Sequence, residues 1–422
     1  MAWVDRRGFL VRTGRGLAAA ALASTRADQP KAGAQATLED WAAVRALFNL
    51  RADVLHFGGL LLASHPAPVR EAIEAHRGGL DDNPVEYLHQ NQARLEAGVL
   101  RAAGAYLGVA PTDIALTDST TMGLGLLYNG LDLGPQHEIL TTTHDFYATH
   151  EALRLKAQRS GAAFRGVRLY ADSASASQNE IVDALAAALT PRTRVVAVTW
   201  VHSSTGVKLP IRALADAVAA ANVNRDPADR ALLCVDGVHG LGVEDLDLAG
   251  LGCDFFVAGC HKWLFGPRGT GFVWGHPRAW PAAAPTIPTF SDANLPGGAM
   301  TPGGFHSFEH RWALAEAFDL HRQIGKTRVA TRVHALNRQL KEGLAAMSHV
   351  RLRTPMDEEL SAGLVCFEVA GLSPQAVVDR LRAAGIIATL TPYATTYARL
   401  APGLINSPEE VDAVLAAISV LA

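Results

Sequence analysis

Two apolar runs in the middle of the chain each end in charged residues. The first run, 231–235, ends at Asp236, and the second, 254–258, is followed closely by His261-Lys262 and a turn rich in glycine and proline. Continuous apolar runs of this length are typical of strands that are buried on both faces of a parallel sheet. Because the carboxyl ends of parallel strands share one edge of the sheet, we expect Asp236 and Lys262 at the edge where open α/β sheets bind ligands.

Strands and helices alternate on both sides of these two runs. A short strand at 113–117 leads into a Ser/Thr/Gly turn and an apolar helix, and strands of the buried type follow at 138–142 and 194–199. This βαβ alternation predicts an α/β fold with right-handed crossovers and a mostly parallel sheet. The other predicted elements are helices at 38–50 (capped by Thr37), 68–76, 90–107, 210–223, 373–384 and 408–421, a long helix ending near 322, and strands at 363–369, 385–389 and 398–403.

Composition narrows the class of protein. The chain has 422 residues, enough for two domains, and a net charge of −3, which gives no reason to expect nucleic acid as a partner. No run after the first 40 residues has the length and apolar purity of a membrane span. Its four cysteines have no Cys-x-x-Cys spacing, which favours buried thiols over a disulfide framework or a metal site: Cys234, Cys253, Cys260 and Cys366.

The first 36 residues differ from the rest. The paired Arg6-Arg7, followed by Phe-Leu and an alanine-rich apolar stretch at 16–23, resembles a twin-arginine export signal. An Asp at position 5 and two further arginines depart from the usual pattern, and an Ala/Arg-rich tail without a targeting role is the alternative. We expect export to the periplasm, and a cytoplasmic location otherwise.

Lys262 and Asp236 together indicate pyridoxal 5′-phosphate (PLP). A lysine between apolar residues and a glycine-rich loop is poorly solvated and loses its proton more easily, as an imine-forming lysine requires. An acid at the same sheet edge is suited to hold the proton of a pyridinium nitrogen. Ser119-Thr120-Thr121, which lies before a helix, is suited to bind the phosphate, although such clusters are also common helix caps.

Two further strand ends carry side chains that suit a flat cofactor. His144 is expected to stack on the pyridine ring, although a lone histidine is more often a solvated loop residue. Ser203, at the end of the strand at 194–199, is expected to hydrogen-bond the ring oxygen.

In combination and order, these motifs resemble the class V aminotransferase family of PLP-dependent enzymes of fold type I. The motifs are 119–121, 203–206, 235–239 and 261–262 with the turn at 266–271. The resemblance implies a large domain (63–290) with a mostly parallel, seven-stranded type of sheet and a smaller α+β domain (291–422). It also implies an N-terminal segment (37–62) that packs with the small domain, after a signal or linker at 1–36.

The resemblance assigns roles residue by residue. Lys262 would form a Schiff base with PLP and move the α-proton, and Asp236 would pair with the pyridine nitrogen. His239 would lie near the ring oxygen, His261 would contact the phosphate, and Arg399 would grip the substrate carboxylate. Gly259 stands where many members carry a phosphate-binding serine. The family forms homodimers with shared active sites, and the loop with His306 and Ser307 is a candidate substrate contact, for which surface residues are an equal alternative.

The absence of a cysteine from one loop limits the reactions that the enzyme is expected to catalyse. Residues 389–397 hold no cysteine, although desulfurases carry their nucleophilic cysteine on this loop. We therefore expect an aminotransferase-type enzyme acting on an amino acid or a peptide-like amine, with an epimerase or a C–S/β-elimination lyase of the same family as alternatives. A PLP-binding sensor or assembly partner is the alternative without turnover. The export signal and the His/aromatic loop at 303–312 are also similar to exported PLP enzymes of siderophore maturation.

Overall fold

The strands predicted in the large domain lie in a seven-stranded sheet in the computed structural model, which describes residues 38–245 and 247–421. Two of its strands, β4 and β8, were not predicted. Its order is β2-β8-β7-β6-β5-β3-β4, and only β8 runs antiparallel to its neighbours. The strands are β2 (Ile114–Thr117), β3 (Glu138–Thr142), β4 (Ala163–Val167), β5 (Thr193–Thr199), β6 (Leu232–Asp236), β7 (Phe255–Gly259) and β8 (Gly271–Gly275). The mostly parallel sheet predicted from the apolar runs is therefore confirmed. The export signal and Thr37 lie outside the described residues.

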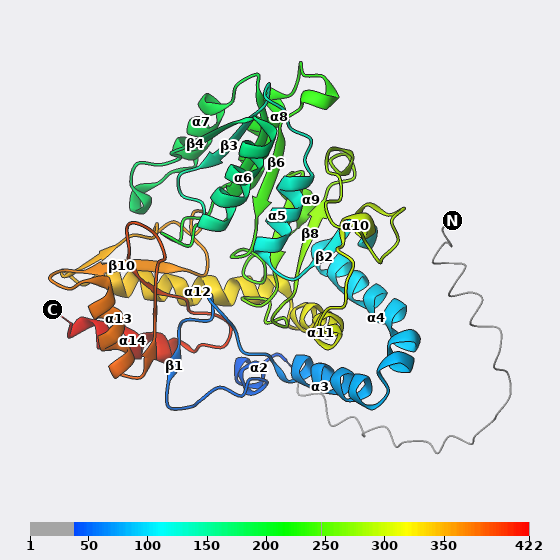
Figure 1. Cartoon of the computed structure of the whole chain (residues 1–422). Coiled ribbons are helices and arrows are strands. Elements are labelled where there is room, and N and C mark those ends of the chain that lie inside the picture. The colour runs from blue at the N-terminus through cyan, green and yellow to red at the C-terminus, as the bar shows by residue number, and fades with distance from the viewer. Residues whose placement is uncertain (1–37, 246, 422) are drawn as a thin grey trace, which may run out of the picture. The chain divides into compact units, whose positions relative to one another are not determined.

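Helices cover both faces of this sheet (Figure 1). Alternate residues of β5 and β6 point to opposite faces, so that Val196 and Val235 enter one apolar core while Ala197 and Cys234 enter the other. The first core is shared with α7 (Gln178–Ala188) and α8 (Ile211–Ala221), and the second with α5 (Thr120–Gly130) and α6 (Tyr147–Ser160). Burial on both faces is why the middle of each strand is apolar, from Val195 to Val198 in β5 and from Leu232 to Val235 in β6. All four cysteines are buried and unpaired, as expected.

Three long helices pack together beside the sheet. α11 (Phe308–Ile324) contacts both α3 (Ala67–Asp82) and α4 (Pro84–Leu107). Two short helices, α9 (Leu248–Leu251) and α10 (Pro296–Met300), also lie between the elements already named. Among the described residues, no helix is long and apolar enough to cross a membrane.

The C-terminal part is built on a second, antiparallel sheet of order β12-β13-β10-β9. Its strands are β9 (Val350–Leu352), β10 (Val365–Val369), β12 (Thr389–Leu390) and β13 (Ala398–Leu400), and its helices are α12 (Lys326–Ala345), α13 (Pro374–Ala383) and α14 (Pro408–Ser419). β1 (Leu55–His56) pairs in parallel with β11 (Ile386–Ile387), which brings the start of the described chain to this part. The division into domains stays a prediction.

Several predicted elements were wrong in their bounds. The helices predicted over 68–76 and 90–107 are longer in the structure, where α3 ends at Asp82 and α4 begins at Pro84. The helix predicted over 38–50 is only α2 (Trp41–Ala46), capped by Asp40, because its chain turns at Leu47 to reach the bridge between Phe48 and Pro66. The strand predicted over 385–389 is two strands, because β11 pairs with β1 while β12 pairs with β13.

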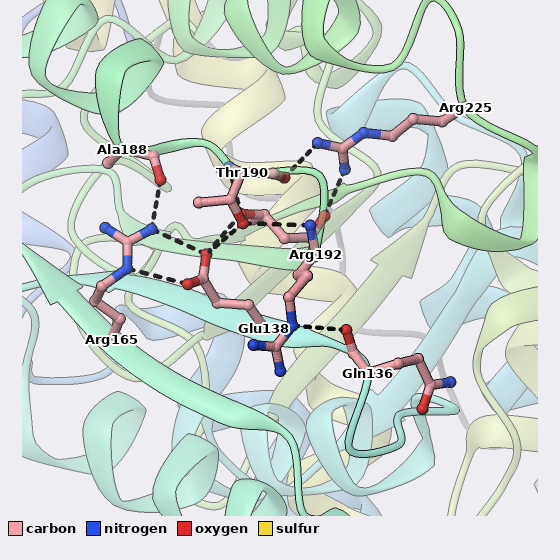
Figure 2. A network of polar contacts seen from close by, with 8 residues as sticks. Gln136, Glu138, Arg165, Ala188, Thr190, Arg192 and Arg225 are labelled. Atoms are coloured by element: carbon pink, nitrogen blue, oxygen red, sulfur yellow. Dashed lines mark hydrogen bonds and ion pairs between the residues drawn. The ribbon is translucent and has the colours of Figure 1, made fainter.

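Arginine side chains form hydrogen bonds and ion pairs at the amino-terminal edge of the large sheet (Figure 2). Arg165 bonds the carboxylate of Glu138, with one distance of 2.9 Å, and the carbonyl of Ala188. Arg225 donates to the carbonyls of Thr190 and Thr193, both at 2.6 Å. Guanidinium groups thus satisfy the carbonyl groups of the turns at this edge, and the candidate site lies at the opposite edge.

Candidate functional site

Asp236 and Lys262 meet at the carboxyl edge of the large sheet, as the sequence predicted. Asp236 is the last residue of β6, and Lys262 lies three residues beyond β7 in the turn that leads to β8. His239, in the turn after β6, places its Nε2 3.3 Å from the Nζ of Lys262. The side chains of Asp236 and His239 are buried.

Burial shifts the pKa values of both Lys262 and Asp236. It lowers the pKa of Lys262 to about 8, although the carboxylate of Asp236 opposes the shift. It also raises the pKa of Asp236 to about 6, against the opposing effects of the Val238 amide and the Lys262 charge. At pH 8 Asp236 is therefore mostly ionised, and roughly half of Lys262 is a free amine; at pH 7 the free amine falls to roughly a tenth.

The predicted phosphate turn connects β2 to α5. Ser119 is the N-cap of α5, and its Oγ accepts from the amide of Met122 at 3.1 Å. Thr120 and Thr121 open the helix, where backbone amides have no partner within the helix. Thr120 Oγ1 accepts from the amide of Gly259 at 2.8 Å, which joins this turn to the end of β7.

Gly259 explains how this turn comes so close to His261. A Cβ at position 259 would lie 2.9 Å from Thr120 Oγ1 and 3.1 Å from Cε1 of His261. A side chain at position 259 would therefore crowd Thr120 and His261. Burial, aided by the charge of Lys262, lowers the pKa of His261 to about 4, so this ring offers an anion a neutral N–H group.

His144 is held as a flat ring at the end of β3. It stacks on Tyr170 with ring centroids 3.9 Å apart and an interplanar angle of 10°, and its Nε2 accepts from the Leu169 amide at 3.2 Å. Burial lowers its pKa to about 3, so the ring is neutral. The neighbouring Asp145 accepts from the amide of Thr199 at 2.7 Å, which ties this turn to the end of β5.

Arg399, on β13, reaches from the second sheet to Ser203. Its Nη1 donates to the carbonyl of Ser203 at 2.7 Å, and its Nε donates to Oγ1 of Thr389 at 3.0 Å. Arg399 is buried and forms no ion pair with an acid among the described residues. A buried guanidinium bonded only to neutral groups is suited to bind an incoming carboxylate.

His306 and Ser307 lie with the phosphate turn. His306 Nδ1 is 3.6 Å from Oδ1 of Asp118, the residue before Ser119, and Arg311 approaches the same oxygen at 3.6 Å. Ser307 is exposed at the start of α11 and caps no amide there. No described contact joins either residue to Arg399, and their role in substrate binding stays a prediction.

Two residues of the site were missed by sequence reasoning. Tyr393, on the loop at 391–397, bonds its hydroxyl to Ser203 Oγ at 2.7 Å, and Trp263 donates from Nε1 to His239 Nδ1 at 3.3 Å. Trp263 follows Lys262 directly, a signal that was available. Tyr393 had none, because its partner lies 190 residues away.

The donor set fits PLP. A buried acid and a desolvated lysine lie at one strand edge, a helix start with hydroxyl groups adjoins them, and His144 offers a flat neutral ring. The residues that would hold the cofactor are those predicted for it: Ser119, Thr120, Thr121, His144, Ser203, Asp236, His239, His261 and Lys262.

Comparisons with known proteins agree with this geometry. The family model "Aminotransferase class-V" matches residues 85–390. Isopenicillin N epimerase from Streptomyces clavuligerus is 25% identical over 403 residues, which cover 90% of this chain and 98% of that protein. A cysteine desulfurase from Klebsiella pneumoniae (strain 342) is 27% identical over 290 residues, which cover 66% of this chain and 67% of that protein.

Solved structures share the fold. A lysine-to-alanine variant of C-DES, with glycine covalently linked to its PLP cofactor, superposes with a TM-score of 0.82 at 24% identity, covering 90% of this chain and 99% of that chain. The cysteine desulfurase from Thermococcus onnurineus NA1 gives a TM-score of 0.74 at 20% identity, covering 90% of this chain and 97% of that chain. These structures confirm the predicted fold class.

Proposed function

Because the chain belongs to the aminotransferase class V family, whose members depend on PLP, we propose that it acts on the α-carbon of an amino acid or a peptide-like amine. The observation that carries this proposal is the pairing of desolvated Lys262 with Arg399, a buried guanidinium that has no acidic partner among the described residues. One group is suited to move a proton, and the other is suited to orient a carboxylate.

Each residue has a distinct task in the proposed reaction. PLP, when bound, supplies a ring that withdraws electrons from the α-carbon. Arg399 binds the substrate carboxylate and thereby orients the α-carbon toward Lys262. Lys262 as a free amine takes the α-proton at Nζ, and in the aminotransferase-type outcome it would deliver that proton to a carbon of the cofactor and not back to the α-carbon. Asp236, ionised above pH 6, holds a proton on the ring nitrogen.

An aminotransferase-type outcome is our first proposal, because one base, Lys262, suffices for it. Epimerisation is the second, and Tyr393 favours it. This phenol lies at the site through its bond to Ser203, and a second acid is what reprotonation from the opposite face requires. The similarity to isopenicillin N epimerase supports the same alternative.

A persulfide-forming desulfurase is disfavoured by the described cysteines. Cys366 is fully buried in β10, and burial raises the pKa of its thiol to about 12. Such a thiol is a poor nucleophile. The loop at 391–397, which carries Tyr393, has no cysteine.

The test begins with the visible absorbance of the chain with bound PLP. Lys262→Ala should abolish the absorbance of the lysine-bound cofactor, while Lys156→Ala, a lysine that bonds only the Asn129 carbonyl at 3.2 Å, should not. Incubation of the coloured wild type with amino acids in deuterated water should exchange the α-proton and release a keto acid.

The products decide between the reactions. Loss of chirality without keto acid would favour epimerisation, and ammonia with a β-eliminated fragment would favour a lyase. A colourless wild type, or one that exchanges no α-proton with any amino acid or peptide-like amine, would contradict the proposal.

We also propose, from the sequence alone, that the enzyme is exported through its Arg6-Arg7 signal and acts as a homodimer with shared active sites.

A further inference from the structure

The indole of Trp263 makes a specific contact beside Lys262. It is only 4% exposed, and its Nε1–H donates to Nδ1 of His239 at 3.3 Å. An indole nitrogen donates and does not accept, so Nδ1 of His239 must be the unprotonated nitrogen. Burial, with the charges of Lys262 and Arg399, lowers the pKa of His239 well below its usual value, so the imidazole is neutral. Its single proton therefore lies on Nε2.

This tautomer matters because Nε2 faces Lys262. The Nε2 of His239 is 3.3 Å from the Nζ of Lys262. A protonated Nε2 is a donor, and an ammonium group has no lone pair to accept its proton. The contact therefore forms only with the free amine of Lys262. The opposite tautomer would present a lone pair and stabilise the ammonium form instead.

The walls around the indole keep it in this position. A Cβ at Gly363, before β10, would lie 2.7 Å from Cη2 of Trp263, and one at Gly403, after β13, would lie 3.4 Å from Cζ3. Gly363 thus leaves room for the ring, and Gly403 lies in ordinary contact distance of it. The indole is packed between the turn that carries Lys262 and segments of the second sheet, which leaves its N–H directed at His239.

We propose that Trp263 is a positioning residue that fixes the tautomer of His239, so that the Nε2–H of His239 holds Lys262 as a free amine. This inference rests on the proposed function, because it concerns the lysine that carries the cofactor. Two other groups act on the charge of Lys262: Asp236 on β6 favours the ammonium, while Arg399 on β13 opposes it. The adjacent His261 is neutral, because burial and the charge of Lys262 lower its pKa to about 4.

The first experiment measures how the rate of PLP rebinding to the PLP-free full-length chain depends on pH. The free amine is the reactive form, so the midpoint of the rate profile reports the ionisation of Lys262. We expect a midpoint near pH 8 for the wild type. In Trp263→Phe the ring N–H is lost and His239 is free to change tautomer, so the midpoint should rise by about one pH unit.

Two variants of His239 separate positioning from packing. His239→Gln keeps an acceptor for Trp263 and an N–H donor for Lys262, and its midpoint should stay near that of the wild type. In a His239→Ala background, Trp263→Phe should cause no additional shift, since the indole then has no tautomer to fix. An unshifted midpoint in Trp263→Phe, or an equal shift in the His239→Ala background, would overturn the proposal.

A direct measurement covers the case in which a variant fails to fold. Nitrogen-15 NMR of histidine-labelled wild type, with the His239 signals assigned by their loss in His239→Gln, reports which ring nitrogen carries the proton. A proton on Nε2 supports the proposal, and a proton on Nδ1 overturns it. The tautomer is readable in the PLP-free chain, so a wild type that never becomes coloured would refute the proposed function alone.

Discussion

At the scale of single residues, the buried Asp236 predicts a pH-dependent stability. Its pKa of about 6 exceeds the ordinary value of 3.8, so the folded chain binds this proton more tightly than the unfolded chain. The associated stability is complete below the ordinary pKa and is lost as the pH rises through 6. Asparagine has no such dependence. In the PLP-free chain, Asp236→Asn should therefore gain stability over the wild type, from about zero near pH 4 to roughly 1–3 kcal/mol above pH 7.

Urea unfolding of both chains across this pH range measures the difference. The matched control is Asp379→Asn, an exposed carboxylate that pairs with Arg382 at 3.5 Å, and it reports the effect of the same acid-to-amide change outside the site. A difference for Asp236→Asn that is constant from pH 4 to pH 8 would contradict the assigned shift.

Some residues of the candidate site could be predicted from the sequence and others could not. Asp236 and Lys262 were predictable because one directly follows an apolar run and the other lies a few residues beyond one, and parallel strands bring such ends to one edge. Tyr393 was not, because its partner Ser203 lies 190 residues earlier, in the turn after β5, and no local pattern links them. The tautomer of His239 was equally inaccessible, since it depends on the direction of one N–H group of Trp263.

At the scale of elements, the turn from β2 into α5 predicts that helix capping and cofactor binding are coupled. Ser119→Ala loses the cap of the Met122 amide and should destabilise the chain by about 1 kcal/mol. Because the same hydroxyl orders the first turn of α5, the affinity for PLP should fall about tenfold. Ser177→Ala removes an equivalent cap from α7, where Ser177 Oγ accepts from the Glu180 amide at 3.2 Å.

The two serine variants should lose similar stability in urea, but Ser177→Ala should keep its PLP affinity. Equal PLP affinities in fluorescence titrations of the two variants would show that Ser119 acts only as a cap.

Elements were predicted well where apolar periodicity was long and poorly where pairing decided the outcome. α14 was expected over 408–421 and ends at Ser419, with the predicted Ser407 cap forming a full capping box with Glu410. The segment 385–389 reads as one strand, yet its two halves pair with different partners. Nothing local in those residues encodes the arrival of β1 from the other end of the chain.

At the scale of the whole molecule, the proposed export and the proposed dimer can be tested in one experiment. Protein recovered from the periplasm should carry PLP and sediment as a dimer, because the twin-arginine route transports folded proteins. Arg6→Lys with Arg7→Lys should leave the same coloured dimer in the cytoplasm, whereas Arg12→Lys with Arg15→Lys should not impair export. Cell fractionation followed by analytical ultracentrifugation measures both. An unchanged distribution would refute export, and a coloured, active monomer would refute the shared active site.

The arginines that bind the turns at the amino-terminal edge of the sheet (Figure 2) have a consequence for how the reaction of such an enzyme can change in evolution. Arg165 and Arg225 satisfy the turns at that edge, while the residues that select chemistry stand at the opposite edge. Loops such as 391–397 can therefore accumulate substitutions without loosening these bonds. One scaffold can then support different reactions, and the proteins similar to this chain include both an isopenicillin N epimerase and a cysteine desulfurase.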